Sequence, residues 1–297
     1  MKIDSGTLNG LRVGFKTSFQ NGLAQAASQH SRVATKVTSS SKSEVYGWLG
    51  KVPRIREWIG DRVVQNLMEH EYTIKNKSFE LTIGVDRDDI NDDNLGIYGP
   101  LFSQMGTETA NHPDTLVFPL LNAGFATLCY DGQNFFDTDH PVLDAQGGTV
   151  SVANTDGGAG TPWFLLCTKQ ALKPVIYQER KPFEFVSKDD PKDDNVFDRK
   201  EYVYGVDGRS NVGFGFWQMA WGSKQTLNAA NYATARNAIM SMKGDYGKPL
   251  GLVPDLLVVP PSLEGSAKKI VQSMLVNGGE TNEWAGTAEV LVSPWLS

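Results

Sequence analysis

Cysteine, histidine and long apolar runs are all scarce in this chain of 297 residues. Its two cysteines, Cys129 and Cys167, cannot make a disulfide framework for so long a chain, so a reducing compartment is expected. The first residues include no apolar core of signal-peptide length, and no run approaches the roughly 18 apolar residues of a membrane helix. These absences predict a soluble protein that is made in a cytoplasm and does not enter a membrane.

Positive charge is also in short supply, because 28 lysines and arginines face 34 aspartates and glutamates. The net charge of −6 argues against a dedicated DNA-binding protein, which would present a basic face. Hydrophobic residues make up 40% of the chain, enough for a packed core in one large or two ordinary domains. We therefore expect a folded protein that contacts nucleic acid only weakly, if at all.

Recognisable catalytic motifs are missing as well. No Gly-x-Ser-x-Gly elbow occurs, and no two of the four histidines have the i, i+4 spacing of a zinc-binding helix. One cluster, Asp137, Asp139 and His140, has the residue types of a metal site and supports the alternative of a metal-dependent hydrolase. The competing interpretation is a turn, since His140 precedes Pro141. The lack of a larger constellation favours a structural or binding protein, without a cofactor, over an enzyme.

The stretch from residue 44 to residue 93 carries the strongest local pattern. Tyr72–Lys75 and Phe79–Val85 flank a short polar connection and are predicted to pair as a hairpin, the second strand alternating apolar and polar residues. An isolated hairpin is marginal in water, so we infer a projecting arm that is buried against another copy of the chain. The alternative is an ordinary sheet edge in a self-contained domain. Residue types favoured at interfaces are also frequent here, and the candidates are Trp48, Arg54, Arg56, Glu57, Trp58, Asp61 and Arg62.

A helix followed by a flexible segment is predicted before this stretch. Apolar residues recur at helical spacing through residues 7–29, and Thr7 can cap the first turn. The serine-rich run at residues 38–43 is typical of a flexible connector. Together they predict an N-terminal arm, and the sequence leaves open whether the arm packs on its own body or on a neighbour.

Helices and strands continue through the rest of the chain. Tyr98–Asn111 and Pro113–Ala123 have helical spacing, and Pro113 and Pro119 are expected to break or kink this rod. From Thr226 onward, two helices alternate with two short strands and predict a compact αβαβ sub-domain.

Two glycines interrupt the aromatic strand that precedes this sub-domain. Gly213 and Gly215 lack the third glycine of a dinucleotide-binding motif, and they do not lie at a strand-to-helix turn. Glycine inside a strand more often permits close packing or a bulge, which is the prediction for this pair.

Several long motifs give the sequence a specific resemblance. In order along the chain they are YGWLGKVPRIREWIGDR (46–62), NKSFELTIGVDRDDINDDNLGIYGP (76–100), CYDGQNFFDTDHP (129–141), GFGFWQMA (213–220) and KPLGLVPDLLVVPPSLEGSAKKI (248–270). With these motifs the chain resembles the major head subunits of Mu-like phages. The resemblance implies an α+β, HK97-like phage capsid fold. Its expected parts are an N-terminal arm (1–43), an extended loop hairpin (44–93), a peripheral domain with the spine helix (94–225) and an axial domain (226–297).

The resemblance also implies a function. A major capsid protein assembles into the pentamers and hexamers of an icosahedral shell around double-stranded DNA, which it should contact only weakly because the DNA must slide in and leave again. Its other expected partners are scaffolding, portal and decoration proteins, with no membrane. It would be found in the virion and, during assembly, in the host cytoplasm. A cargo-holding nanocompartment of the same fold is a further alternative, since only the Mu-like motifs separate the two.

Overall fold

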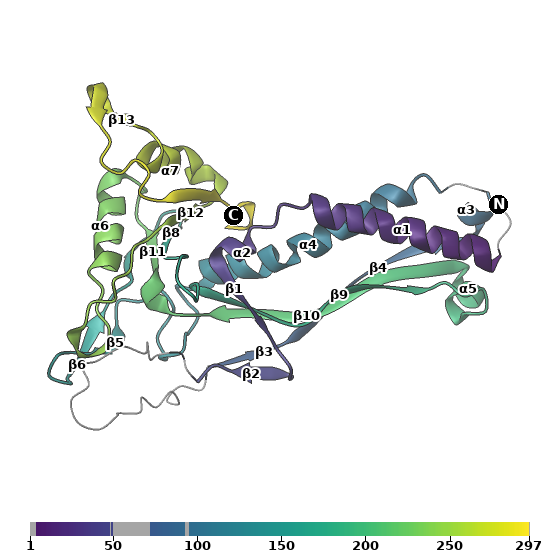
Figure 1. Ribbon diagram of the computed structural model, residues 1–297, viewed down its shortest axis with the longest axis horizontal. Coiled ribbons are helices and arrows are strands. Elements are labelled where there is room, and N and C mark those ends of the chain that lie inside the picture. Colours follow the sequence, from purple (N-terminus) through teal and green to yellow (C-terminus); the bar gives the residue numbers. More distant parts are fainter. Residues whose placement is uncertain (1–3, 48, 50–71, 93–94, 297) are drawn as a thin grey trace.

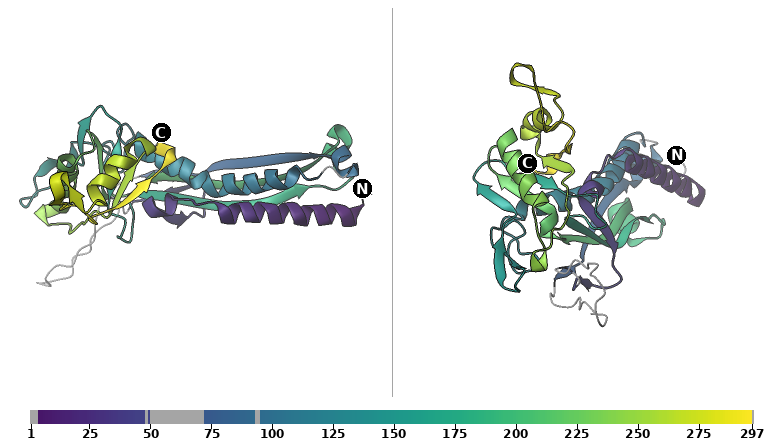
Figure 2. Two further views of the ribbon diagram at one scale, coloured as in Figure 1. Left: turned by 90° about the horizontal axis from the view of Figure 1, so that it is seen from above. Right: turned by 60° about the vertical axis from the view of Figure 1, so that its left-hand side comes forward.

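The computed structural model describes residues 4–47, 49, 72–92 and 95–296. The molecule is elongated, with a long limb and a compact block at one end of it (Figures 1 and 2). The limb (chiefly 5–25, 77–92, 95–123 and 175–214) has two long helices over a four-stranded sheet, and the block (chiefly 126–172 and 215–296) is built around a five-stranded sheet. This mixture of helices and sheets confirms the α+β class.

Two long helices run side by side along the limb (Figures 1 and 2). They are α1, Ser5–Gln25, and α4, Tyr98–Ala123. The cap of α1 is Asp4, whose side chain accepts a hydrogen bond from the Thr7 N–H at 2.8 Å, so the predicted cap by Thr7 is wrong. The helices approach so closely that a Cβ on Gly22 would lie 1.9 Å from a carbonyl oxygen of α4. The helix predicted within residues 7–29 therefore packs on α4 of its own chain.

The sequence predicts a break or kink at Pro113 and Pro119, and the break does not occur, because α4 runs as one helix past both prolines. A proline inside a helix costs about 3 kcal/mol, because it removes one backbone hydrogen bond and crowds the preceding turn. Here Pro113 is buried together with Val117, Phe118 and Leu121. Burial of a large apolar side chain contributes about 1.5–3 kcal/mol. The packing of this face therefore outweighs the local preference for a break.

The sheet of the limb has the strand order β1, β9, β10, β4. The bounds are Ala34–Thr38 for β1, Lys77–Asp86 for β4, Val175–Lys188 for β9 and Glu201–Phe214 for β10. β1 is parallel to β9, and the other two pairs are antiparallel. Two short helices, α3 (Arg87–Asn91) and α5 (Asp194–Arg199), lie at the far end of the limb (Figure 1).

The hairpin predicted between Tyr72–Lys75 and Phe79–Val85 is wrong. β3, Thr73–Lys75, pairs with β2, Ser43–Val45, whereas β4 pairs along its length with β10. Only Asn76 separates β3 from β4, so the chain passes from one sheet to the next without reversing. β4 is thus an edge strand of its own chain's sheet, as the self-contained alternative requires for this part of the stretch.

The sheet of the block has the order β15, β12, β8, β11, β7. Its strands are β7 (Thr155–Gly158), β8 (Trp163–Leu166), β11 (Ala220–Lys224), β12 (Leu256–Val259) and β15 (Glu289–Val292). The two helices predicted beside these last strands are α6 (Ala229–Met240) and α7 (Glu264–Val271). Since β12 pairs with β8 as well as with β15, the predicted αβαβ unit does not form a sheet of its own.

The remaining elements are short. They are α2 (His30–Val33), the hairpin β5 (His140–Leu143) with β6 (Thr149–Val152), and the hairpin β13 (Leu275–Val276) with β14 (Glu280–Thr281). One hydrophobic core fills the block and its junction with the limb, and a smaller one lies between α1, α4 and the limb's sheet. Within the described ranges, no helix is long and apolar enough to span a bilayer.

Candidate functional site

All interface candidates of the extended loop lie outside the residues that the structure describes. They are Trp48, Arg54, Arg56, Glu57, Trp58, Asp61 and Arg62. The structure does describe the base of that loop, which we call the loop base and define as residues 39–46 and 72–76 (Figure 1). In it β2 and β3 are antiparallel, and the Tyr46 N–H donates to the Tyr72 carbonyl at 2.8 Å. The chain therefore leaves and re-enters the body through a closed two-stranded ladder.

A buried amide joins the loop base to the sheet of the limb. Gln178 on β9 is fully buried, and its Oε1 accepts a hydrogen bond from the Tyr46 hydroxyl at 2.7 Å. Its Nε2 donates to the Ile74 carbonyl at 3.0 Å and to Asn76 Oδ1 at 2.8 Å. Burial, with a smaller effect of the nearby Glu44 charge, raises the pKa of Tyr46 to about 12. The hydroxyl therefore stays protonated and remains a donor at neutral pH.

The turn before β2 is organised by one carboxylate. Glu44 Oε1 accepts hydrogen bonds from the Ser40 N–H at 2.8 Å, the Ser39 hydroxyl at 2.9 Å and the Ser41 N–H at 3.1 Å. These bonds, that from Ser40 first, lower the pKa of Glu44. Asn76 Nδ2 donates to Ser39 Oγ and to the Ser41 carbonyl, both at 2.9 Å. The segment predicted to be a flexible connector is thus a hydrogen-bonded turn.

A glycine on β10 lets the loop base pack against the sheet. A Cβ on Gly213 would lie 2.3 Å from Ile74 Cδ1 and 3.0 Å from the Tyr72 hydroxyl. The same hydroxyl accepts a hydrogen bond from the Phe214 N–H at 2.9 Å. A Cβ on Gly215 would meet a backbone carbonyl at 2.7 Å. The prediction that these two glycines permit close packing is confirmed.

The residues of the alternative metal site do not converge. Asp137 accepts hydrogen bonds from the backbone and side chain of a neighbouring asparagine, and Asp139 accepts one from the Ser151 hydroxyl. His140 is fully buried and faces Asp131, with 2.7 Å between its Nδ1 and Asp131 Oδ2. Each of the three has a separate partner, so the metal-dependent hydrolase is not supported.

A different trio, Cys129, Asp131 and His140, does come together, with ligand-type atoms within 4.8 Å of one another. These atoms already bond to each other, because the Cys129 thiol donates to Asp131 Oδ1 at 3.0 Å and His140 Nδ1 contacts Oδ2. His140 Nε2 lies 3.3 Å from Asn154 Oδ1, and its ring stacks on Trp217 with centroids 3.9 Å apart. Burial raises the pKa of Cys129, which keeps the thiol protonated. We therefore assign the trio a structural role in the core of the block.

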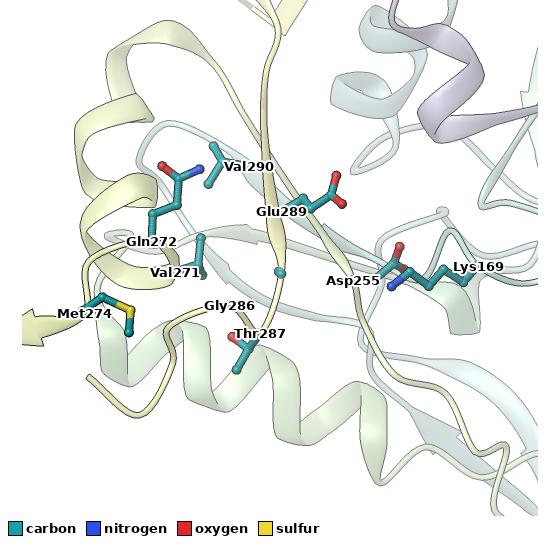
Figure 3. Close-up of a pocket in the computed structure, with 10 residues that line it drawn as sticks. Lys169, Asp255, Val271, Gln272, Met274, Gly286, Thr287, Glu289 and Val290 are labelled. Carbon is teal, nitrogen blue, oxygen red and sulfur yellow. The ribbon is translucent and has the colours of Figure 1, made fainter. Parts of the chain in front are cut away.

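An open groove of about 590 Å³ lies beside β15 at the edge of the block's sheet (Figure 3). Its lining includes Asp255, Met274 and Glu289. Both carboxylates are engaged, since Asp255 accepts bonds from the Thr168 N–H at 2.6 Å and hydroxyl at 2.7 Å, and Glu289 pairs with Arg32. Both carboxylates of the groove therefore already have partners.

Surfaces suited to association occur on both parts of the molecule. Phe197 at the far end of the limb is 88% exposed, and Met274 on the block is 75% exposed. β1 and β4 are the edges of the limb's sheet, and along the part of the chain that the structure describes their outer sides pair with no strand. Exposed edges and exposed large apolar side chains are features that a stable monomer normally covers.

Comparison with known proteins identifies the family. The family model of the Mu-like prophage major head subunit gpT matches residues 8–296. The major capsid protein of Escherichia phage Mu is 42% identical over 305 aligned residues, which cover both chains completely. The Mu-like prophage FluMu major head subunit of Haemophilus influenzae is 46% identical over 272 residues, covering 89% of this chain and 88% of that protein.

Solved structures agree with this result. A chain of the procapsid of bacteriophage JBD30 is similar with a TM-score of 0.88 and 46% identity, covering 99% of this chain and all of that one. A chain of the JBD30 capsid has a TM-score of 0.78 and 37% identity, with 94% of each chain covered. The expected phage capsid fold is therefore confirmed, and the chain belongs to the family of Mu-like prophage major head subunits.

Proposed function

We propose that this chain assembles with copies of itself into the icosahedral head of a Mu-like bacteriophage. Its copies would form the pentamers and hexamers of a shell that encloses double-stranded DNA. The observation that carries the proposal is the full-length alignment with the phage Mu major capsid protein at 42% identity. The function is structural and needs no catalytic site.

The shape of the molecule supports self-assembly. A thin limb buries less of its own surface than a compact block does, so it gains stability by packing against neighbours. Its sheet edges β1 and β4 and the exposed Phe197 offer backbone and apolar contacts. Subunits of permanent assemblies typically bury more than about 2,000 Å² against each other. We expect a burial of this size for each copy in the shell.

The parts of the capsid fold can be assigned to the observed elements. Residues 1–43 would be the N-terminal arm and residues 44–93 the extended loop. The rest of the limb, with α4 as the spine helix, would be the peripheral domain, and the block would be the axial domain. Because β8 and β11 precede residue 226 in the block's sheet, this axial domain would include more of the chain than residues 226–297.

Further partners follow from the family. Scaffolding and portal proteins are expected during assembly, and the seven candidates of the extended loop remain the proposed contacts between subunits. A JBD30 capsid is described as decorated with minor capsid protein trimers, which supports a decoration partner here too. The net charge of −6 suits a shell whose inner surface must let DNA move.

Electron microscopy of the purified, full-length protein tests the proposal. Closed shells of uniform size are expected, and particles recovered from phage-producing cells should protect DNA from nuclease. A nanocompartment would instead protect protein cargo. A folded chain that stays monomeric at high concentration would contradict the proposed function.

The extended loop can be tested by replacing residues 50–71 with a Gly-Ser linker of about six residues. The hydrogen bond between the Tyr46 N–H and the Tyr72 carbonyl closes the loop base, so the subunit should still fold. The shortened chain should remain soluble and fail to form shells, as measured by light scattering. Shells of normal size and yield would show that the loop is not needed between subunits.

A further inference from the structure

The loop base is attached to the sheet of the limb by side chains rather than by a backbone ladder between strands. β2 and β3 form a two-stranded sheet that is separate from the four-stranded one. From β10, Asn211 Nδ2 donates to the Lys75 carbonyl at 2.7 Å, and the Phe214 N–H donates to the Tyr72 hydroxyl at 2.9 Å. From β9, Gln178 reaches the Ile74 carbonyl. A few side-chain contacts therefore set the direction in which β2 and β3 leave the body.

Gln178 makes this direction specific. Its carboxamide is fully buried and bonds at once to Tyr46, Ile74 and Asn76, using its acceptor oxygen and its N–H donors. Buried polar groups without partners are costly, so a tilted loop base would leave several of them unpaired. Hydrogen bonds are directional, whereas apolar packing tolerates sliding. A glutamine at this position thus favours a single orientation of the loop base.

Gly213 adds a steric limit to the same orientation. A Cβ there would lie 2.3 Å from Cδ1 and 2.7 Å from Cγ1 of Ile74. The backbone of Gly213 is not in the left-handed region, so an alanine could adopt the same backbone conformation. Its Cβ, however, would collide with the side chain of Ile74. Any side chain at this position would have to displace the side chain of Ile74, which is buried between β3 and the sheet of the limb.

We propose that Gln178, Asn76 and Gly213 form a positioning unit that fixes the direction of the extended loop and thereby the angle at which one copy of the chain meets a second copy. The inference rests on the proposed function. The loop base is where the extended loop joins the body, so its orientation sets the direction in which the chain leaves the body. Every copy in a closed shell has to meet its neighbours within a narrow range of angles, because angular errors open a closed assembly into an irregular one.

The variant Gly213→Ala and its rescue test the proposal in the full-length chain. Gly213→Ala should give folded subunits, shown by circular dichroism and thermal unfolding, whose yield of closed shells in micrographs falls about tenfold. Adding Ile74→Ala to the same chain removes the colliding atoms and should restore the yield. Val186→Ala, at an exposed position of β9, is the control and should assemble like the unaltered chain. A merely structural role would give lower thermal stability without rescue of assembly.

Two outcomes would overturn the proposal: closed shells of normal yield from Gly213→Ala, or a folded double variant that assembles no better than Gly213→Ala alone. If Gly213→Ala does not fold, Gln178→Leu decides, since it keeps an apolar body and removes the hydrogen bonds. Folded Gln178→Leu subunits without closed shells support the proposal; normal shells, or a chain that does not fold, reject it. If the unaltered chain makes no shells, the proposed function fails instead.

Discussion

Replacing Asp114 by alanine should loosen the connection between residues 28–30, at the start of α2, and the helix α4. Asp114 on α4 is 1% exposed, and its carboxylate accepts hydrogen bonds from three donors at the start of α2. These donors are the Gln29 N–H at 3.0 Å, the Ser28 hydroxyl at 3.1 Å and the His30 N–H. Alanine would leave the two backbone N–H groups without their acceptor, whereas the Ser28 hydroxyl would keep its contact with His30 Nδ1 at 2.7 Å.

The expected cost follows from the strength of these bonds. A hydrogen bond to a charged group contributes about 1.5–3 kcal/mol, and a buried donor left unpaired costs about 1–3 kcal/mol. Residues 28–30 are only half-buried, so water can replace part of the loss. We therefore expect Asp114→Ala to lower the free energy of unfolding by about 3 kcal/mol in total, and Asp114→Asn, which keeps one acceptor oxygen, by about 1 kcal/mol. For a chain of this size, each kcal/mol lowers the melting temperature by roughly 2–4 °C.

Thermal unfolding of unassembled subunits measures the effect, with Glu108→Ala as the matched control. Glu108 is exposed on the same helix and accepts one hydrogen bond, from Gln104 Nε2 at 2.7 Å, so its loss should cost less than about 0.5 kcal/mol. Hydrogen exchange should locate the loss of protection in residues 28–33. Equal melting temperatures for the Asp114→Ala and Glu108→Ala chains would refute the role of Asp114.

Two other substitutions test the packing of α1 and α4. Gly22→Ala should destabilise the subunit by about 1–3 kcal/mol in urea unfolding, because the new Cβ would meet a backbone oxygen of α4 at 1.9 Å, while Gly14→Ala, with no atom within 4 Å, should stabilise it by up to about 1 kcal/mol. A similar result at both glycines would contradict the close approach of the helices. His112 is a third site, where the ring centroid lies 4.2 Å from that of Phe79 and burial lowers the pKa of the imidazole. The neutral His112 therefore contributes stability above its ordinary pKa of 6.5, and this contribution is lost as the pH falls through the lowered pKa. His112→Phe should remove this part of the pH dependence between pH 7 and 5, and an unchanged slope there would show that another group is responsible.

The identity and bounds of several elements could be predicted from local sequence. The two short strands predicted after Thr226 are observed as β12, Leu256–Val259, and β15, Glu289–Val292. Both are short apolar runs, and Pro260 or Pro294 follows within two residues, so local chemistry decides where they end. The break predicted within α4 failed for the opposite reason, since the packing of Pro113 depends on parts of the chain that are remote in sequence.

Strand pairing was the part that local sequence could not provide. A hairpin of neighbouring strands closes the smallest loop, so proximity alone favoured joining β3 to β4. β4 instead pairs with β10, with Val85 opposite Tyr202, which lies more than a hundred residues away. Val85 and Tyr202 are both buried in the core beside α1 and α4. The stability gained by packing this sheet against α1 and α4 depends on the whole limb, so the sequence around β3 and β4 alone does not predict the pairing.

The contacts of the loop base could be predicted from the sequence only in part. Gln178 is the last residue of a buried run that begins at Val175. Because a buried polar side chain needs a hydrogen-bond partner, the sequence could predict that Gln178 has one, but not which residue it is. Which face of the sheet the Gln178 side chain occupies depends on the register that places Gln178 opposite Asn211 on β10. The register shifts on both sides of Arg209, and a slip of one residue would turn Gln178 to the opposite face of the sheet. The irregularity at Arg209 therefore separates the register around Gln178 from that of the outer parts of β9 and β10, and local sequence does not reveal a shift of this kind.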